Sequence, residues 1–384
     1  MRVAVLGAGY AGVVLADRLE RRLPSDVDLV VVDDTGSHLV QHELHRAVRR
    51  PSFEDDIVVS LDDIFDRARV RHATVASVDR DRRVVEFADG EEMAYDVAAV
   101  CLGAETAYYD LPGVEEHSIP LKRLPDARRI RESFLDTVRA GGGTVVVGGA
   151  GLSGVQVAGE LAAFAREEHA DDDVDVVLVE QMDDVAPSFP AKFQDAVREE
   201  LDAEGVDVRT GVTVEQATEE AVETESGVIP YETFVWTGGI RGPDALAGER
   251  ADVRADLTLD DHTVAVGDVA RVVDAEGAAV PASAAAAVRE AKVAARNVER
   301  LVDDQRDVDD GFRPRLERYT FDSPGWLVSV GDGAVAQVGP SVFRGRAAKA
   351  VKTGVGASYL AAAGDIRNAV GLVREEFDFE RHGD

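Results

Sequence analysis

Three glycines near the N-terminus have the spacing of a dinucleotide phosphate site. Gly7, Gly9 and Gly12 form a GxGxxG motif, and an acidic residue, Asp33, follows after about 20 positions. The first glycine permits a sharp turn, the second lets the backbone approach a pyrophosphate, and the third lets a helix lie close to a strand. Free N–H groups and the helix dipole attract the phosphate, while the carboxylate accepts hydrogen bonds from ribose hydroxyls. The predicted chemistry is dinucleotide binding.

The same combination recurs in the middle of the chain. Gly149, Gly151 and Gly154 repeat the glycine spacing, and Glu180 takes the place of the acid. The two motifs lie much farther apart than the roughly 20–50 residues of a repeat array, so they indicate two separate dinucleotide folds. Two such sites suggest hydride exchange between a resident cofactor and an exchanging one. No arginine occurs in the four residues after Glu180, so this carboxylate favours the free 2′-hydroxyl of NADH over the 2′-phosphate of NADPH.

Buried parallel strands must position both motifs. Apolar runs at 3–6 and 144–148 lead directly into the glycines, and apolar positions at helical spacing follow them. Three more apolar runs, at 97–100, 233–237 and 263–266, end in glycine turns. The pattern predicts an α/β protein with two Rossmann-like dinucleotide-binding domains of three layers, in ββα and βαβ order.

Two further segments have a distinct local signature. The β-like runs 70–78 and 83–87, with the turn signal Asp89–Gly90, predict a hairpin. Pro281 and Ser283 begin an alanine-rich helix, whose N-terminal dipole suits an electron-rich ring such as a flavin.

The composition narrows the classes of partner. The chain has 42 Lys and Arg against 74 Asp and Glu, a net charge of −32, so its surface repels nucleic acid. The acidic residues are spread along the whole chain, as expected for a halophilic protein in a high-salt cytoplasm. Neither a secretory signal nor an uninterrupted apolar run of about 18 residues is present, which predicts a cytoplasmic location.

The single cysteine limits the redox chemistry. Cys101 lies in an apolar run, which is typical of a core position rather than of a reactive thiol. One cysteine excludes a CxxC disulfide reductase, thiol-based sulfide oxidation and a cysteine-ligated iron–sulfur cluster. His38, His42 and His45 share one helix face, but no carboxylate or cysteine completes a ligand set with them. No metal site is predicted.

These features together resemble the two-dinucleotide flavoprotein reductases and, within them, the type II NADH:quinone dehydrogenases, which do not pump protons. The resemblance covers nearly the whole chain and rests on the following segments: GAGYAG with Asp33, SHLVQHEL, residues 102–131, GGAGLSGVQVAGEL, VWTGGIR, VGDVA, the helix after Pro281, and GWLVSVGDGAVAQVG. It implies tightly bound, non-covalent FAD and NADH as substrate.

The resemblance also assigns residues and domains. It implies that FAD is held by Gly7, Gly9, Gly12, Asp33, Gly103, Gly267 and Asp268, with Asp268 at the ribityl chain. It implies that NADH is held by Gly149, Gly151, Gly154, Glu180 and Gly238. The FAD domain is then expected at 1–110 and 233–312, with the NADH domain inserted at 111–232 and a C-terminal β and helical region at 313–384.

The chain departs from the family pattern near the electron acceptor. The AQxxxQ signature of the family falls on Ala285 and Arg289, so both glutamines are missing. A glutamate that many relatives carry in the NADH motif is replaced by Gln156, which keeps hydrogen bonding and loses the charge. These two departures leave the predicted FAD and NADH binding unchanged, but they leave open which electron acceptor the protein uses. Gln156 and Arg289 are the candidate catalytic residues.

The resemblance implies hydride transfer from NADH to FAD and electron transfer to a quinone. A reductase of a soluble electron-carrier protein and a non-enzymatic flavin redox sensor are the alternatives. The C-terminal segment contains a basic cluster, formed by Arg344, Arg346, Lys349 and Lys352, that suits anionic headgroups at the cytoplasmic membrane face. A helix pair that closes a domain or forms a homodimer explains the same segment.

Overall fold

The first glycine motif lies at the carboxyl edge of a five-stranded parallel sheet. The computed structural model of the protein describes residues 1–306, 314–323, 325–345 and 348–349. The strands of this sheet are, in spatial order, β21 (Thr263–Ala265), β9 (Val97–Val100), β1 (Arg2–Leu6), β2 (Asp28–Asp33) and β5 (Arg69–His72). All neighbouring strands are parallel, so their carboxyl ends meet at one edge.

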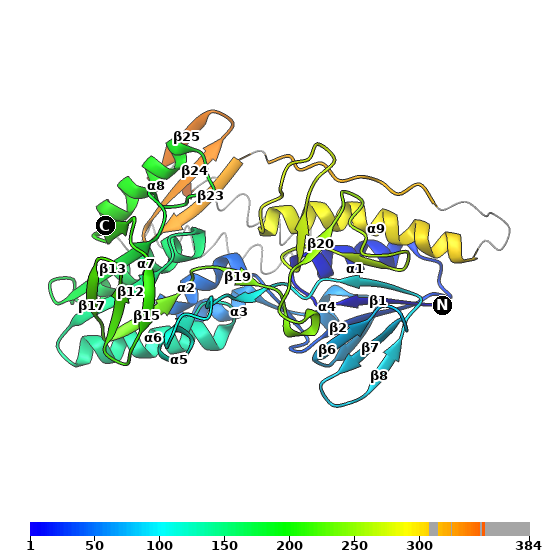
Figure 1. Cartoon of the computed structure of the whole chain (residues 1–384), viewed down its shortest axis with the longest axis horizontal. Helices are drawn as coiled ribbons and strands as arrows, with labels where there is room; N and C mark the ends of the chain where they lie inside the picture. The colour runs from blue at the N-terminus through cyan, green and yellow to red at the C-terminus, as the bar shows by residue number, and fades with distance from the viewer. Residues whose placement is uncertain (307–313, 324, 346–347, 350–384) are drawn as a thin grey trace.

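Helices cover one face of this sheet and a meander covers the other. Helices α1 (Tyr10–Arg22) and α9 (Ala284–Arg306) pack against each other on the first face (Figure 1). The antiparallel strands β6 (Val75–Asp79), β7 (Val84–Phe87) and β8 (Glu92–Ala94) lie on the second, where Val85 and Met93 join the same core. The predicted α/β fold with a three-layer domain is confirmed.

The predicted hairpin forms in part, because β6 pairs antiparallel with β7, but residues 70–72 do not belong to it. Residues 70–78 form two strands instead of one, since β5 joins the parallel sheet and β6 starts the meander. Ala73 donates its N–H to Asp33 O at 3.0 Å and so continues the β2 ladder, whereas Thr74 O accepts the N–H of Ala88 at 2.9 Å. The Asp89–Gly90 turn therefore joins β7 to β8.

The second glycine motif lies on a sheet of the same kind. This parallel sheet has the order β11 (Ile119–Pro120), β18 (Thr233–Trp236), β12 (Gly143–Gly148), β13 (Val174–Glu180) and β14 (Asp207–Thr210). Along β12 the side chains alternate, so Val145 and Val147 join the helix-side core while Val146 joins the core under the meander. The helices are α6 (Leu124–Arg139), α7 (Leu152–Glu167) and α8 (Ala191–Glu204), and the meander is β15 (Val214–Ala217), β16 (Ala221–Thr224) and β17 (Gly227–Pro230).

The chain crosses between the two sheets twice. It leaves the first sheet after β9 through β10 (Glu105–Thr106) and returns through β19 (Ile240–Arg241), which pairs antiparallel with β10. Strands β20 (Ala251–Val253) and β22 (Ala270–Val272) then flank the return of β21 to the first sheet. The second Rossmann-like unit is thus inserted in the first, as predicted, while the boundaries 1–110, 111–232, 233–312 and 313–384 stay predictions.

An antiparallel sheet from the C-terminal region packs on the inserted unit. Strands β23 (Gly325–Val330), β24 (Gly333–Val338) and β25 (Ser341–Arg344) lie against α7 and α8 (Figure 1). The Nε of Arg344 donates to Glu200 Oε2 at 3.0 Å, so this member of the predicted basic cluster is paired within the protein. Arg346, Lys352 and the predicted C-terminal helices lie outside the described residues. Within the described ranges, no helix is long and apolar enough to cross a membrane.

Short elements complete the described chain. They are β3 (Ser37–Leu39), β4 (Val58–Ser60), α2 (Leu44–Arg49), α3 (Glu54–Ile57), α4 (Leu61–Ile64), α5 (Val114–His117) and the 3₁₀ turns at Gln41–Glu43, Pro51–Phe53 and Asp244–Leu246. Of these, α2 packs against both α6 and α7, so it links the two units.

Candidate functional site

The first glycine motif forms an open cradle between β1 and α1. Gly7 has a φ of +96°, which only glycine adopts readily, and an added Cβ on Gly12 would lie 1.9 Å from Gly7 O. These two positions therefore require glycine for the turn itself. Gly9, the residue that precedes α1, has ordinary backbone angles, and an added Cβ would meet no protein atom within 4 Å. Space is left at Gly9 for a phosphate beside the helix N-terminus.

The second motif repeats this geometry. Gly149 has a φ of +93°, and an added Cβ on Gly154 would lie 1.8 Å from Gly149 O. Gly151 precedes α7, and an added Cβ there also meets nothing within 4 Å. Each cradle thus has two glycines required by the fold and one that only a bound group explains.

Each cradle is tied to its acid by the same hydrogen bond. Ala8 N donates to Asp33 Oδ2 at 3.0 Å, and Ala150 N donates to Glu180 Oε2 at 2.7 Å. The second carboxylate oxygens accept backbone N–H groups from Thr35 at 2.9 Å and from Met182 at 2.9 Å, respectively. Both acids are held at the ends of β2 and β13, in the place from which a carboxylate can accept ribose hydroxyl protons.

The remaining predicted glycines lie at the same sheet edges. Gly103 follows β9 with a φ of +70° and has no atom within 4 Å of an added Cβ. Gly267 follows β21 with a φ of +79°, where an added Cβ would come 3.1 Å from Ala11 Cβ. Gly238 follows β18, and an added Cβ would meet the Trp236 ring at 2.4 Å. The carboxyl ends of parallel strands are where ligands bind in open α/β sheets.

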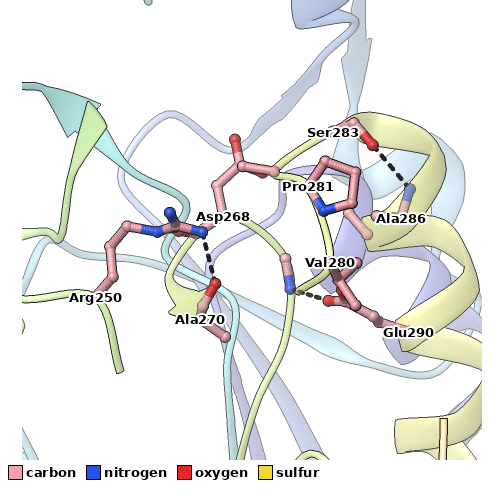
Figure 2. Close-up of a pocket in the computed structure, with 11 residues that line it drawn as sticks. Arg250, Asp268, Ala270, Val280, Pro281, Ser283, Ala286 and Glu290 are labelled. Carbon is pink, nitrogen blue, oxygen red and sulfur yellow. Dashed lines mark hydrogen bonds between the residues drawn. The ribbon is translucent and has the colours of Figure 1, made fainter. Parts of the chain in front are cut away.

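Asp268 lies in a pocket between its own loop and the start of α9 (Figure 2). Arg250 holds the loop from one side, since its Nε donates to Asp268 O and its Nη2 to Ala270 O, each at 2.7 Å. Ser283 accepts the N–H of Ala286 at 3.2 Å and so caps α9, which confirms the predicted helix start. The helix N-terminus and the Asp268 carboxylate therefore face the same space.

Sequence reasoning missed Glu290 in this pocket. Its side chain points toward Gly267, whose N–H donates to Glu290 Oε2 at 2.7 Å (Figure 2). The residue is 2% exposed, and burial raises the pKa of its carboxyl to about 7. A carboxylate among Ala286, Ala287 and Ala291 on the apolar face of a helix was the available sequence signal.

The candidate Arg289 points elsewhere. Its guanidinium donates to Ala285 O on its own helix at 2.9 Å, and the residue does not line the pocket. The two positions that replace the family glutamines therefore contact each other.

The candidate Gln156 connects the two units. It lies on α7, and its Nε2 donates to His42 O, on the segment that follows β3, at 3.2 Å. His42 in turn contacts the Tyr10 hydroxyl through its Nδ1. Tyr10 begins α1, directly after the first cradle. Gln156, on the helix of the second motif, is therefore connected to the first cradle through His42 and Tyr10.

Two of the three histidines, His38 and His42, contact the first cradle. The predicted common helix face is wrong, because the three histidines lie in β3, in the 3₁₀ turn Gln41–Glu43 and in α2. His38 Nδ1 hydrogen-bonds Ala8 O at 2.9 Å, and burial lowers the pKa of His38 to about 4, so the ring is neutral near pH 7. Its ring also makes an edge contact with Tyr10. Among the residues that the structure describes, no group of three His, Cys, Asp or Glu side chains is arranged to hold a metal ion.

Removal of the only thiol should leave the site working. Cys101 is 4% exposed behind the Gly7 turn, and burial raises the pKa of its thiol, so it holds its proton near neutral pH. We expect Cys101→Ala to retain the nucleotide content of the wild-type protein within about twofold, with a stability loss of roughly 1 kcal/mol for the small cavity. Absorbance of the purified protein and urea unfolding measure these effects. Loss of bound nucleotide in a folded variant would show that the thiol contributes to the site.

The two sheets, each with a glycine cradle and a terminal acid, define a protein of the two-dinucleotide-binding class. Residues 1–291 match the family described as pyridine nucleotide-disulphide oxidoreductase, and the chain belongs to this family.

The chain is also similar to named relatives. It is 27% identical over 295 residues to the NADH dehydrogenase-like protein YutJ of Bacillus subtilis, which covers 76% of this chain and 80% of the relative. It is 24% identical over 338 residues to the type II NADH:quinone oxidoreductase of Staphylococcus saprophyticus, which covers 79% and 83%.

Solved structures share the fold. NDH2 of Plasmodium falciparum in complex with NADH aligns with a TM-score of 0.81 at 13% identity, over 97% of each chain. The sulfide:quinone oxidoreductase of Aquifex aeolicus aligns with a TM-score of 0.76 at 17% identity, over 95% of this chain and 92% of that one.

Proposed function

We propose that the protein is an FAD-dependent NADH dehydrogenase that passes electrons to a quinone. The observation that carries this proposal is the pair of equivalent cradles, each with its acid bonded to the turn, in one chain. The relatives named NADH dehydrogenase-like protein and type II NADH:quinone oxidoreductase support it. The family name refers to a disulphide, but a chain with a single cysteine cannot form one internally, so the flavin itself must deliver the electrons.

The two cradles take different nucleotides in this proposal. The first cradle and its sheet edge hold FAD through Gly7, Gly9, Gly12, Asp33, Gly103, Gly267 and Asp268. The second holds NADH through Gly149, Gly151, Gly154, Glu180 and Gly238. The acid at Glu180 selects NADH, because a carboxylate accepts bonds from a 2′-hydroxyl and repels a 2′-phosphate.

The protein's own residues bind and orient the two nucleotides. Bound FAD would supply the redox chemistry, by accepting a hydride from NADH and releasing two electrons to the acceptor. Gln156 orients the junction between the cradles through its bond to His42 O. The N-terminus of α9 directs its dipole toward the space beside Asp268, where it stabilises negative charge.

Quinone is the proposed acceptor, and its proposed site lies beside the start of α9. The helix that carries the family's glutamines has Ala285 and Arg289 here, which favours an acceptor site of different polarity at the same place. Peripheral contact with the cytoplasmic membrane face is part of this proposal, because quinones reside in the membrane. A homodimer stays a prediction.

Anaerobic stopped-flow absorbance in molar salt tests the function. We expect mixing with NADH to bleach the flavin band and a menaquinone analogue to restore it. If the flavin bleaches and only a soluble carrier such as a ferredoxin restores it, the quinone assignment is wrong and the reductase alternative holds. A bleached flavin that no acceptor reoxidises favours a redox sensor, and a protein that binds no flavin contradicts the proposal.

A further inference from the structure

A buried carboxyl group lies directly beneath the proposed flavin site. Glu290 projects from the second turn of α9 toward the β21 end, and its Oε2 accepts the Gly267 N–H at 2.7 Å (Figure 2). Gly267 precedes Asp268, the residue proposed for the ribityl chain. The carboxyl therefore touches the backbone of the loop that would hold the flavin, although it has no part in the reaction derived above.

The surroundings of Glu290 disfavour a second negative charge. The Asp268 carboxylate, in the β21–β22 loop, repels a negative charge on Glu290, whereas the Arg250 guanidinium attracts it. The Arg250 guanidinium already donates to Asp268 O and Ala270 O. Glu290 also acts on Cys101, which follows β9, and on Tyr319. Both groups have raised pKa values and are neutral near pH 7.

The overall reaction leaves one proton to be supplied. A quinone becomes a quinol by gaining two electrons and two protons, whereas the hydride of NADH brings two electrons and one proton. The second proton comes from solvent, and a group beside the flavin can take it up while the electrons are on the flavin. A group that gains a proton when negative charge arrives nearby meets this requirement.

We propose that Glu290 takes up this second proton when the bound flavin is reduced and returns it when the acceptor is reduced. An O–H bond forms on the carboxylate as the two electrons arrive, and it breaks as they leave, so the cycle consumes one solvent proton per NADH. This inference rests on the proposed flavin site. The raised pKa of Glu290, about 7, places the change in the physiological range.

The flavin midpoint potential as a function of pH tests the proposal on the holoprotein. Each proton taken up with a two-electron couple changes the potential by ~30 mV per pH unit. Below about pH 7 Glu290 is protonated in both redox states, so the wild-type slope should equal that of a variant without this carboxyl. Above this pH the wild-type slope should be ~30 mV per pH unit steeper than that of such a variant, because Glu290 then gains a proton on reduction, whereas protons on the flavin itself are common to both proteins.

Glu290→Gln is the matched substitution. Its amide oxygen still accepts the Gly267 N–H, but it cannot take up a proton, so we expect its slope above pH 7 to be ~30 mV per pH unit shallower than that of the wild type. Asp274→Asn is the control, because Asp274 is also buried and accepts backbone N–H groups, from Ala278 at 2.9 Å and Phe321 at 3.0 Å, which hold its pKa below the usual range. The control should keep the steeper wild-type slope.

The outcomes separate this inference from the proposed function. Equal slopes above pH 7 in the wild type and in Glu290→Gln would overturn the role of Glu290 while leaving the flavoprotein assignment intact. Absence of bound flavin, or of its bleaching by NADH, would overturn the proposed function and this inference with it. If Glu290→Gln loses flavin, Glu290→Ala, which also cannot take up a proton, replaces it in the comparison of slopes.

Discussion

Gly151→Ala should keep its bound flavin and lose its reduction by NADH. An added methyl group at this position meets no protein atom within 4 Å, and the backbone angles of Gly151 suit alanine, so the fold has no reason to change. The methyl group instead occupies the space where the pyrophosphate of NADH would approach the start of α7.

The expected loss of NADH affinity is about 100-fold. A hydrogen bond to a charged group contributes roughly 1.5–3 kcal/mol, and displacement of the phosphate weakens about two of them. A loss of ~3 kcal/mol corresponds to about 100-fold in the dissociation constant. The measurement is the NADH concentration that gives half-maximal bleaching rate in the stopped-flow instrument.

Gly9→Ala is the matched control and should show the opposite defect. An added methyl group at Gly9 also meets no protein atom, so this variant should fold and purify with little or no FAD. Its affinity for NADH, measured by quenching of NADH fluorescence, should stay near the wild-type value. If Gly151→Ala loses flavin and Gly9→Ala keeps it, the two nucleotides have been assigned to the wrong cradles.

Arg49→Met should destabilise the protein by roughly 3–5 kcal/mol, the range measured when one partner of a buried ion pair is removed. Arg49 ends α2, and its side chain is only 3% exposed. Its Nε donates to Glu160 Oε2 at 2.7 Å, while its Nη1 donates to Glu167 Oε1 at 3.1 Å and Asp332 Oδ1 at 2.9 Å. Because Glu160 is also buried, the substitution removes a cation that offsets its charge in the interior.

This arginine joins three parts of the fold, which explains the size of the effect. Residue 49 belongs to the first unit, Glu160 and Glu167 lie on α7 of the inserted unit, and Asp332 lies in the turn between β23 and β24. We expect the unfolding midpoint in urea to fall, and proteolysis to begin at the C-terminal sheet once Asp332 loses its contact with Arg49.

Two comparisons isolate the buried charge. Adding Glu160→Gln to Arg49→Met should recover part of the loss, since it removes the buried negative charge that Arg49 offsets. Arg209→Met breaks an exposed ion pair with Asp207 and should cost only ~0–1 kcal/mol. An Arg49→Met variant as stable as Arg209→Met would mean that this network does not hold the units together.

Both cradles could be predicted because each is encoded within one short segment. The strand, the turn, the start of the helix and the acid at the end of the next strand are close in sequence, so spacing alone predicts that Asp33 and Glu180 lie beside the glycines. The division of residues 70–78 between two sheets could not be predicted, for the converse reason. Nothing local distinguishes β5, which pairs with a strand formed by residues 28–33, from β6, which pairs with the residues that follow it.

The sequence by itself determined the two dinucleotide folds, the order of the elements and the absence of paired-thiol chemistry. Only the tertiary structure decided which side chains meet between them. Glu290 reaches Gly267 across 23 residues, and Gln156 reaches His42 across 114. These contacts depend on how α9 and α7 pack on sheets formed elsewhere in the chain, and such packing leaves no fixed spacing in the sequence from which it could be inferred.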